Sequence, residues 1–189
     1  LDRAHFASIR RVHALFEARL DLANRPAIIA ARRALQADLA GAQVVLIAGG
    51  HVAALLNRLR LLGGEQWLQE YPVVAWSAGA MAISECVVLF HDRPPQGAAN
   101  AEVFDCGLGL VRGVIALPHA QNRLDLHDNR RMALFARRFA PSSCVTLDGG
   151  ACLHFDEAGG RRRLALHAAT FQLGRDGALL QLPAPEATR

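Results

Sequence analysis

Lysine is absent from this sequence, so arginine carries all of its positive side-chain charge at neutral pH. The 189 residues include 21 arginines and 17 acidic residues, which gives a formal net charge of +4. The arginines are spread along expected helices, as in Arg10-Arg11 and Arg137-Arg138, and aromatic residues make up only 6% of the chain. Nucleic-acid sites gather basic residues together with aromatic ones. We therefore interpret the arginines as solvated surface charge and expect no nucleic-acid partner.

Cysteine is also scarce, and the four cysteines form no motif. Cys86, Cys106, Cys144 and Cys152 show neither a C-x-x-C pair nor the spacing of metal ligands, so we predict no metal site. Three of the four lie in apolar segments, where a free thiol behaves as a small hydrophobic group. A reducing, cytoplasmic compartment is the simplest interpretation of this usage.

Long apolar runs are missing as well. No run approaches the roughly 20 residues that cross a bilayer, so we expect no membrane association. The composition, 52% hydrophobic and 20% charged, is typical of a globular protein, and the length suits one domain. We predict a single domain over residues 1–189, with an α/β core over 1–150 and a hairpin extension over 151–189.

Short apolar strands alternate with amphipathic helices through the predicted core. We expect helices over 4–18, 27–40, 52–62 and 128–139, and strands over 44–48, 73–76, 87–90, 114–117 and 144–147. The extension contains hairpin signals at Gly159-Gly160 and Asp176-Gly177. This order favours a three-layer α/β fold with a doubly wound, mostly parallel sheet and C-terminal antiparallel hairpins. Such a domain usually opens with a strand, whereas this chain opens with a helix, so we expect the first strand to be missing from the sequence.

Residues 73–80, VVAWSAGA, carry the first candidate for catalysis. A buried-type strand breaks at Ser77 into small residues, and a helix-compatible stretch follows. A strand, a sharp turn with a hydroxyl at its apex and then a helix form a nucleophile elbow, which exposes the serine oxygen at the carboxyl edge of the sheet. The usual pattern is G-x-S-x-G; here Ala75 replaces the first glycine and Gly79 supplies the second. The alternative is a serine in an ordinary strand-to-helix turn.

Two further strand ends would bring partners to such a serine. Gly49-Gly50 follows one strand, and its N–H groups would complete an oxyanion hole with the N–H of Ala78. Pro118-His119 follows another strand and places His119 at the carboxyl edge, where open α/β sheets bind ligands. A serine nucleophile needs such a base, and the base in turn needs an orienting acid.

These segments together carry a family resemblance. Residues 46–50 (LIAGG), 76–80 (WSAGA) and 117–119 (LPH) resemble the peptidase E (aspartyl dipeptidase)/cyanophycinase family of serine peptidases. The resemblance covers roughly residues 4–155, and residues 147–151 (LDGGA) fall where the family has another strand-to-turn segment. It implies a class I glutamine-amidotransferase-like, flavodoxin-like fold.

The resemblance also implies roles for individual residues. Ser77 would be the nucleophile and His119 the general base. The N–H groups of Gly50 and Ala78 would form the oxyanion hole. No metal and no cofactor are implied.

The acid of the triad is placed by the family's spacing. This spacing falls on Asp92, which closes the strand after the elbow helix. Glu85 is the rival, because the pattern puts it on the elbow helix two turns beyond the serine. Glu102 and Asp105 are weaker alternatives.

Substrate recognition in this family uses arginine to bind an acidic group, from the region after the catalytic histidine. The candidates here are Arg123 and Arg130, with Arg131 as an alternative to Arg130. His51 stands where the family usually has asparagine, and it would still donate a hydrogen bond to the substrate. The loop over 93–107 and the segment after His119 would shape the pocket.

We therefore predict a cytoplasmic serine peptidase that hydrolyses small peptides, with an N-terminal aspartyl residue as the favoured substrate. A β-aspartyl-arginine peptide, as for a cyanophycinase, is one alternative. A homodimer is compatible with the resemblance, and the apolar residues of the tail would contribute to it (Leu164, Leu166, Phe171, Leu173, Leu179, Leu180 and Leu182).

Three other functions compete with this prediction. A glutamine amidotransferase would need cysteine at the elbow and a His-x-Glu pair, where this chain has Ser77 and His119-Ala120-Gln121. An esterase of the α/β-hydrolase type would place its histidine near the end of the chain. The main rival is a binding or scaffold protein that keeps the elbow without catalysis. Ala75, His51 and the expected absence of the first strand favour it.

Overall fold

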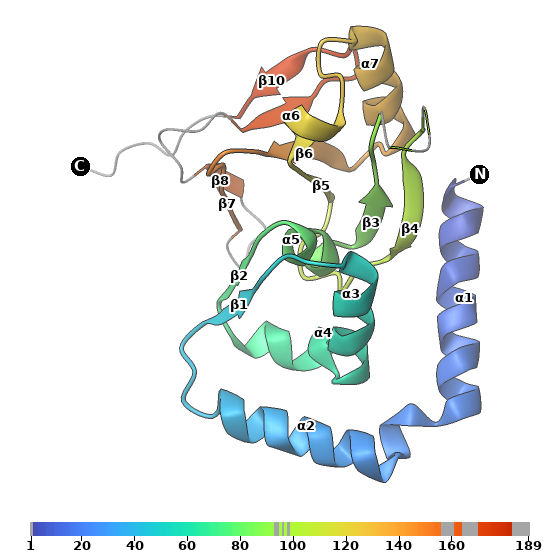
Figure 1. Ribbon diagram of the computed structural model, residues 1–189, viewed down its shortest axis with the longest axis vertical. Coiled ribbons are helices and arrows are strands. Elements are labelled where there is room, and N and C mark those ends of the chain that lie inside the picture. Colours follow the sequence, from blue (N-terminus) through green and yellow to red (C-terminus); the bar gives the residue numbers. More distant parts are fainter. Residues whose placement is uncertain are drawn as a thin grey trace. The chain divides into compact units, whose positions relative to one another are not determined.

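The computed structural model describes residues 2–92, 95, 97, 99–155, 161–163 and 170–182 (Figure 1). Helices and mixed sheets make up this part of the chain, which confirms the predicted α/β class. The chain divides into two compact units. Unit 1 comprises Leu1–Val87 and Val103–Leu110, and unit 2 comprises Val88–Glu102 and Val111–Arg189. The single domain over 1–189, with its division into 1–150 and 151–189, stays a prediction.

Unit 1 contains three of the four predicted helices. Its helical elements are α1 (Asp2–Leu20), the 3-10 turn η1 (Leu22–Asn24), α2 (Pro26–Leu39), α3 (Val52–Leu61), α4 (Gly64–Trp67), η2 (Leu68–Glu70) and α5 (Ala78–Ile83). Pro26 opens α2, a position where its missing N–H is not needed. None of the helices in the described part of the chain combines the length and the apolarity that crossing a membrane requires.

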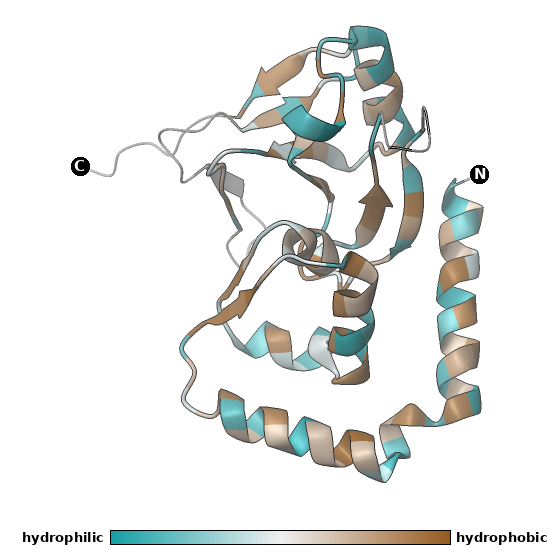
Figure 2. Ribbon diagram, viewed as in Figure 1, coloured by the Kyte–Doolittle hydropathy of each residue, from teal (hydrophilic) through white to brown (hydrophobic). Residues whose placement is uncertain are grey.

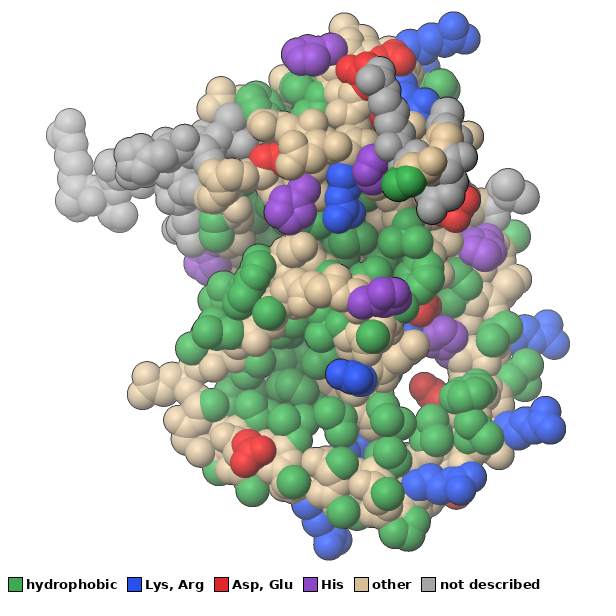
Figure 3. Space-filling view, viewed as in Figure 1, with side chains coloured by type: hydrophobic (Ala, Val, Ile, Leu, Met, Phe, Trp, Pro, Cys, Tyr) green, Lys and Arg blue, Asp and Glu red, His purple; other side chains and the backbone are tan. Residues whose placement is uncertain are grey.

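The strands β1 (Val45–Ile47) and β2 (Val73–Ala75) form a parallel pair in unit 1. Both were predicted as buried strands. The positions of the strands are confirmed, but the prediction that both faces are buried is wrong. Leu46 is 64% exposed and its register partner Val74 is 52% exposed, whereas Ile47 is buried. Hydrophobic side chains accordingly cover the surface over these strands (Figure 3). One face of the pair packs inward and the other meets solvent in the described part of the chain, as in a half-buried sheet.

A buried carboxylate, that of Asp105, contacts two helices of unit 1. Asp105 lies on β4 (Glu102–Cys106), a strand that the sequence pattern did not reveal, and β4 pairs with β3 (Cys86–Leu89). Arg60 on α3 donates to Asp105 at 2.9 Å, and His13 on α1 approaches the same carboxylate at 3.3 Å. Burial raises the pKa of the neighbouring Cys106 thiol, against a hydrogen bond from Arg10 that lowers it. These polar contacts attach α1, which has no buried residue, to the rest of unit 1.

Unit 2 is built on a four-stranded mixed sheet. Its order is β10–β9–β6–β5, from β5 (Val114–Pro118), β6 (Ser143–Leu147), β9 (Phe171–Leu173) and β10 (Leu179–Gln181). The β5–β6 pair is parallel over five residues, and β9–β10 is an antiparallel hairpin. The turn predicted at Asp176-Gly177 therefore joins two paired strands. The single doubly wound sheet expected from the sequence stays a prediction.

Helix α7 (Asn129–Arg138) covers this sheet with one apolar face. Met132 and Phe135 are buried on that side, and α7 packs against β6 and β9. Most of the residues on the other side are polar, and Figure 2 colours part of the ribbon of this helix teal. The side chain of Asp128 accepts a hydrogen bond from the N–H of Arg131 at 3.0 Å and so caps the first turn. The short helix α6 (Ala120–Arg123) precedes it.

The remaining strands of the tail are β7 (Leu153–Phe155) and β8 (Arg161–Arg163), which pair in antiparallel register. The turn predicted at Gly159-Gly160 lies outside the described residues. So do Leu164 and Leu166, two of the residues suggested for a dimer contact. Of the others, Leu173 is buried in unit 2 and Leu180 is 49% exposed. The homodimer stays a prediction.

Candidate active site

Ser77 lies at the apex of a sharp turn between β2 and α5. Its backbone angles are φ 53° and ψ −123°, a region that few residues other than glycine adopt. The N–H of Gly79 donates to the carbonyl of Trp76 at 2.9 Å, which closes the turn. Ser77 occupies the N-cap of α5, yet its hydroxyl makes no capping hydrogen bond. The hydroxyl is therefore not used to hold the helix, as a nucleophile requires.

Two glycines let the chain approach this turn closely. A Cβ atom on Gly49 would lie 2.8 Å from Cβ and 3.0 Å from Oγ of Ser77. A Cβ atom on Gly79 would lie 2.3 Å from the carbonyl oxygen of Ile47. The shortest distance at each position, 2.8 Å at Gly49 and 2.3 Å at Gly79, is below what real side chains allow. The end of β1 and the residues after it therefore fit against the elbow only because these positions lack side chains. Gly79, the second glycine of the elbow motif, is therefore required because a side chain there would collide with β1.

The oxyanion-hole candidates lie on the same two segments. Ala78 begins α5 directly after the serine, and Gly50 follows Gly49 with φ 129°, an angle that favours glycine. His51 caps α3, because its Nδ1 accepts from the N–H of Ala54 at 3.4 Å. An accepting Nδ1 leaves the ring proton of the neutral imidazole on Nε2. The exposed His51 can therefore donate a hydrogen bond, as expected for a residue that contacts a substrate.

His119 holds the corresponding position in unit 2. It follows β5 directly and is exposed, with φ 58° and ψ 37° in the left-handed helical region. Its N–H donates to the carbonyl of Leu147 at 3.3 Å, which ties it to the end of the neighbouring strand β6. Left-handed angles at a residue with a side chain are uncommon, and they cluster at functional sites.

Asp148 belongs to the LDGGA segment of the family resemblance, but it was not among the carboxylates weighed for the triad. It follows Leu147, so it stands at the end of β6 beside the strand that His119 leaves. Its Oδ1 accepts a hydrogen bond from the N–H of Gln121 at 3.2 Å, and Gln121 lies in the short helix that His119 opens. The strand register that brings these residues together cannot be read from the sequence alone.

Asp92, predicted as the acid of the triad, lies in a different set of contacts. Its Oδ1 accepts from Nε of Arg131 at 2.8 Å and also lies 2.8 Å from a second guanidinium nitrogen. Its Oδ2 accepts from the N–H of Asp125 at 2.7 Å. Its own N–H donates to the carbonyl of Arg123 at 2.7 Å. Within the described part of unit 2, no hydrogen bond joins Asp92 to His119.

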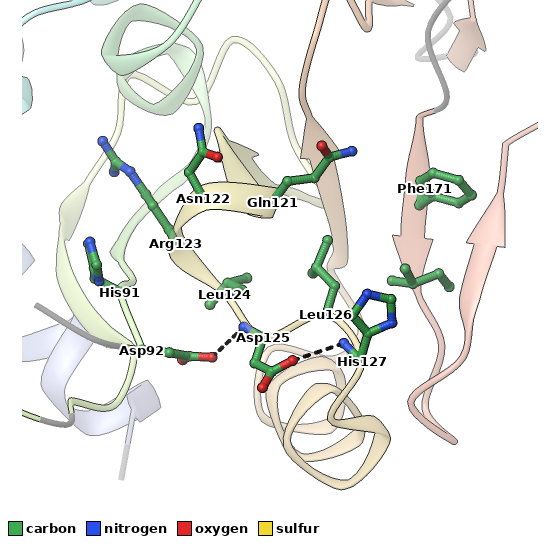
Figure 4. A pocket seen from close by; sticks show the side chains of 11 residues that line it. His91, Asp92, Gln121, Asn122, Arg123, Leu124, Asp125, Leu126, His127 and Phe171 are labelled. Carbon is green, nitrogen blue, oxygen red and sulfur yellow. Dashed lines mark hydrogen bonds between the residues drawn. The ribbon is translucent and has the colours of Figure 1, made fainter.

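A cavity of about 530 Å³ lies in unit 2 beside these residues (Figure 4). Residues 121–127 line it, together with His91, Asp92 and the apolar side chains Phe171 and Leu179. In Figure 4, Asn122 and Arg123 extend from one side of α6, while Asp92 and Asp125 lie on the other. The volume falls in the range of small-molecule sites.

The three arginines proposed for substrate binding are placed differently by the structure. Arg123 lines the cavity, and its guanidinium lies 5.6 Å from the centre of the Phe90 ring. Arg130 is exposed on α7 and does not line the cavity. Arg131 is engaged by Asp92. Of the three, Arg123 therefore has the position that best suits a carboxylate ligand of the cavity.

The other carboxylates weighed for the triad are placed as follows. Glu85 lies beyond α5, which ends at Ile83, so its predicted place on the elbow helix is wrong. Glu102 is exposed on β4. Asp105 is buried in the ion pair with Arg60.

The match to known proteins agrees with this geometry. A model of peptidase family S51 matches residues 6–162, which is most of the chain. The protein thus belongs to peptidase family S51, the peptidase E/cyanophycinase family, and the family resemblance seen in the sequence is confirmed. Membership supports a serine peptidase in general. No curated protein matches the chain.

Proposed function

We propose that this protein is a serine peptidase that hydrolyses small peptides, with a peptide carrying an N-terminal aspartyl residue as the favoured substrate. The observation that carries the proposal is the backbone of Ser77, held at φ 53° and ψ −123° between β2 and a buried helix. A serine in that conformation presents its hydroxyl outward and aims the following N–H at the oxygen of a bound carbonyl. Family membership supports the same chemistry.

The reaction proceeds in two stages. Ser77 Oγ attacks the carbonyl carbon of the scissile bond while His119 takes the hydroxyl proton, and the N–H groups of Gly50 and Ala78 stabilise the oxyanion. The amine product leaves with the proton from His119. A water molecule, deprotonated by His119, then attacks the acyl-enzyme; the bond to Ser77 Oγ breaks, His119 returns the proton to Oγ, and the acid product is released. The mechanism requires the Ser77 hydroxyl and the His119 imidazole to be within hydrogen-bonding distance in the working enzyme. We therefore include in the proposal the doubly wound sheet expected from the sequence, because parallel strands in one sheet bring their carboxyl ends to the same edge.

For the orienting acid, the sequence predicts Asp92 and the geometry favours Asp148. Both carboxylate oxygens of Asp92 are already engaged by Arg131 and Asp125. Asp148 stands at the end of the strand beside His119, and its contact with Gln121 places the carboxylate on the turn that His119 opens. A carboxylate there would hold the imidazole and stabilise its charged form.

The recognition of an acidic group is assigned to Arg123, which lines the cavity in unit 2. An arginine binds a carboxylate through two parallel N–H donors and is always charged at neutral pH. Arg130 stays a predicted contact, from its place on α7, and His51 is a further donor in unit 1. In this proposal the chemistry uses protein side chains, backbone N–H groups and a water molecule.

The test measures amine release from a panel of dipeptides, comprising α-aspartyl, β-aspartyl-arginine and neutral members. The wild type is compared with Ser77→Ala and with Ser8→Ala, a matched control because Ser8 is exposed on α1. We expect an aspartyl peptide to be turned over by the wild type and the control, with at least about a 10³-fold loss in Ser77→Ala. Turnover of the β-aspartyl-arginine member alone would indicate a cyanophycinase-like substrate. No turnover of any peptide by folded protein would favour the binding or scaffold alternative.

A second pair of variants separates the two acids. Asp148→Asn keeps an oxygen that accepts from Gln121 N–H but removes the charge. We expect it to lower kcat by about 10²- to 10⁴-fold, because the imidazolium loses its orienting carboxylate. A loss of that size in Asp92→Asn, with Asp148→Asn close to wild type, would return the role to Asp92.

A further inference from the structure

Asp92 is hydrogen-bonded to three other residues around the cavity of unit 2. It lies on the segment that follows β3, and its side chain is only 11% exposed. Its backbone and side chain together make hydrogen bonds to Arg123, Asp125 and Arg131. These partners come from two other stretches of the chain, namely the segment after His119 and helix α7.

Two of the bonds fix the backbone of the segment that lines the cavity. The N–H of Asp92 donates to the carbonyl of Arg123, and Oδ2 of Asp92 accepts from the N–H of Asp125, both at 2.7 Å. Asp92 thus holds the backbone of Arg123 through its own N–H and the backbone of Asp125 through its carboxylate. Leu124, which lies between them, is buried. In Figure 4 this arrangement places Asp92 directly below the turn that carries Arg123.

The third partner neutralises the charge of Asp92 and extends the link. Arg131 places two guanidinium nitrogens at 2.8 Å from Oδ1, and it also donates to the carbonyl of Ala99. Residues 92 and 99 thereby share one arginine on α7, whose first turn is capped by Asp128. A buried carboxylate without such a partner would be strongly unfavourable. The pair is therefore what allows Asp92 to stand inside this network.

From these contacts we infer that Asp92 and Arg131 are positioning residues, which act as a unit to hold the segment over 121–127 and with it Arg123 in the cavity. The inference rests on the proposed function, because it assigns the cavity to the substrate. It gives Asp92 a different role from that of the acid of the triad. Arg131 in turn is not a ligand of the substrate, although its position in the sequence suggested one.

The experiment uses Asp92→Asn, Arg131→Gln and the double variant of the full chain, with Arg137→Gln as control. Arg137 is exposed on the same helix and donates to the carbonyl of Arg175, away from the network. For the peptide that the wild type hydrolyses, we expect each single variant to raise KM about tenfold with kcat changed less than threefold. In the double variant KM should rise no more than about twentyfold, because both substitutions break the same ion pair and their effects do not add. Arg131→Lys should recover part of the loss, since lysine restores the charge but not the two-pronged contact.

A second readout does not depend on catalysis. Hydrogen exchange of the backbone amides over 121–127 should be at least tenfold faster in Asp92→Asn and in Arg131→Gln than in the wild type or Arg137→Gln. If no protein hydrolyses any peptide while exchange accelerates as expected, the proposed function fails and the positioning role stands. The inference is overturned if exchange is unchanged. It is also overturned if Asp92→Asn lowers kcat by about 10³-fold or more while Arg131→Gln behaves like the wild type.

Discussion

Ser77 in unit 1 and His119 in unit 2 both adopt positive φ angles, but different surroundings impose them. Around Ser77 the decisive contacts are made by residues without side chains: Gly49 and Gly79 leave no room for a Cβ atom. Around His119 the chain is held by directed polar bonds, from its own N–H to Leu147 and from Gln121 to Asp148. The nucleophile side should therefore respond to added volume, and the base side to lost hydrogen bonds and charge.

The largest effect is expected from adding one methyl group at the elbow. In Gly79→Ala the new Cβ would meet the carbonyl oxygen of Ile47 at 2.3 Å, and a strand backbone yields little. We expect a loss of about 3 kcal/mol in the free energy of unfolding. Urea unfolding followed by tryptophan fluorescence measures it in unit 1, because both tryptophans, Trp67 and Trp76, belong to that unit.

Gly41→Ala is the control for this substitution. Gly41 also has a positive φ, 87°, but nothing lies within 4 Å of its Cβ position. Only backbone strain should count there, about 1 kcal/mol. Equal losses in the two variants would show that crowding is not what shapes the elbow.

A smaller steric change should act on activity more than on folding. In Gly49→Ala the new Cβ would lie 2.8 Å from Cβ and 3.0 Å from Oγ of Ser77, so the serine can make room only if its side chain and the turn that carries it shift together. We expect kcat/KM to fall about 100-fold, equivalent to roughly 2.7 kcal/mol, because the nucleophile leaves its attacking position. The rate of labelling by a fluorophosphonate reports the same displacement in a single step. Unchanged labelling would contradict the proposed contact.

The base side can be tested by comparing two substitutions at one position. His119→Gly and His119→Ala should both abolish hydrolysis, but glycine adopts φ 58° without strain, whereas alanine does so at a cost in free energy. We expect the glycine variant to be more stable by about 1 kcal/mol, seen as a higher Tm of a few degrees by circular dichroism. An alanine variant of equal or greater stability would mean that the turn does not keep its left-handed conformation.

Salt should produce the smallest effect and should separate the two sides. At about 1 M NaCl the Debye length falls to roughly 3 Å. Because the side chain of Arg131 is 34% exposed, its pair with Asp92 should weaken, and KM should rise by up to about threefold. The rate at which a small neutral fluorophosphonate labels Ser77 should stay constant. If KM and the labelling rate depended equally on salt, the proposed difference between the surroundings of Ser77 and those of His119 would be contradicted.

Much of the local structure could be predicted from the sequence, because it depends on residues close together in the chain. The run over 73–77 predicted the strand and the turn of the elbow, and apolar periodicity predicted α3 and α7. The hairpin at Asp176-Gly177 was likewise indicated by its turn residues. In each case the pattern and the observed element depend on the same few neighbouring residues.

The features that were missed depend on distant partners. β4 was expected to be loop, because its charged residue Asp105 is buried against distant partners, namely Arg60, 45 positions earlier, and His13 on α1. The place of Asp148 depends on the register of β5 against β6, and the contacts of Asp92 depend on α7. These contacts join charged residues that are far apart in the chain, so a pattern of neighbouring residues cannot predict them.

The order of segments along the chain limits how this protein could be divided or recombined. The chain passes between the two units three times, near residues 87, 102 and 110. A contiguous fragment that ends before residue 103 lacks part of β4, and with it the carboxylate that receives Arg60 and His13. A fragment long enough to include β4 also carries a piece of unit 2. Neither unit can therefore be transplanted into a relative as one uninterrupted segment, and a chimera that exchanges one whole unit needs three junctions.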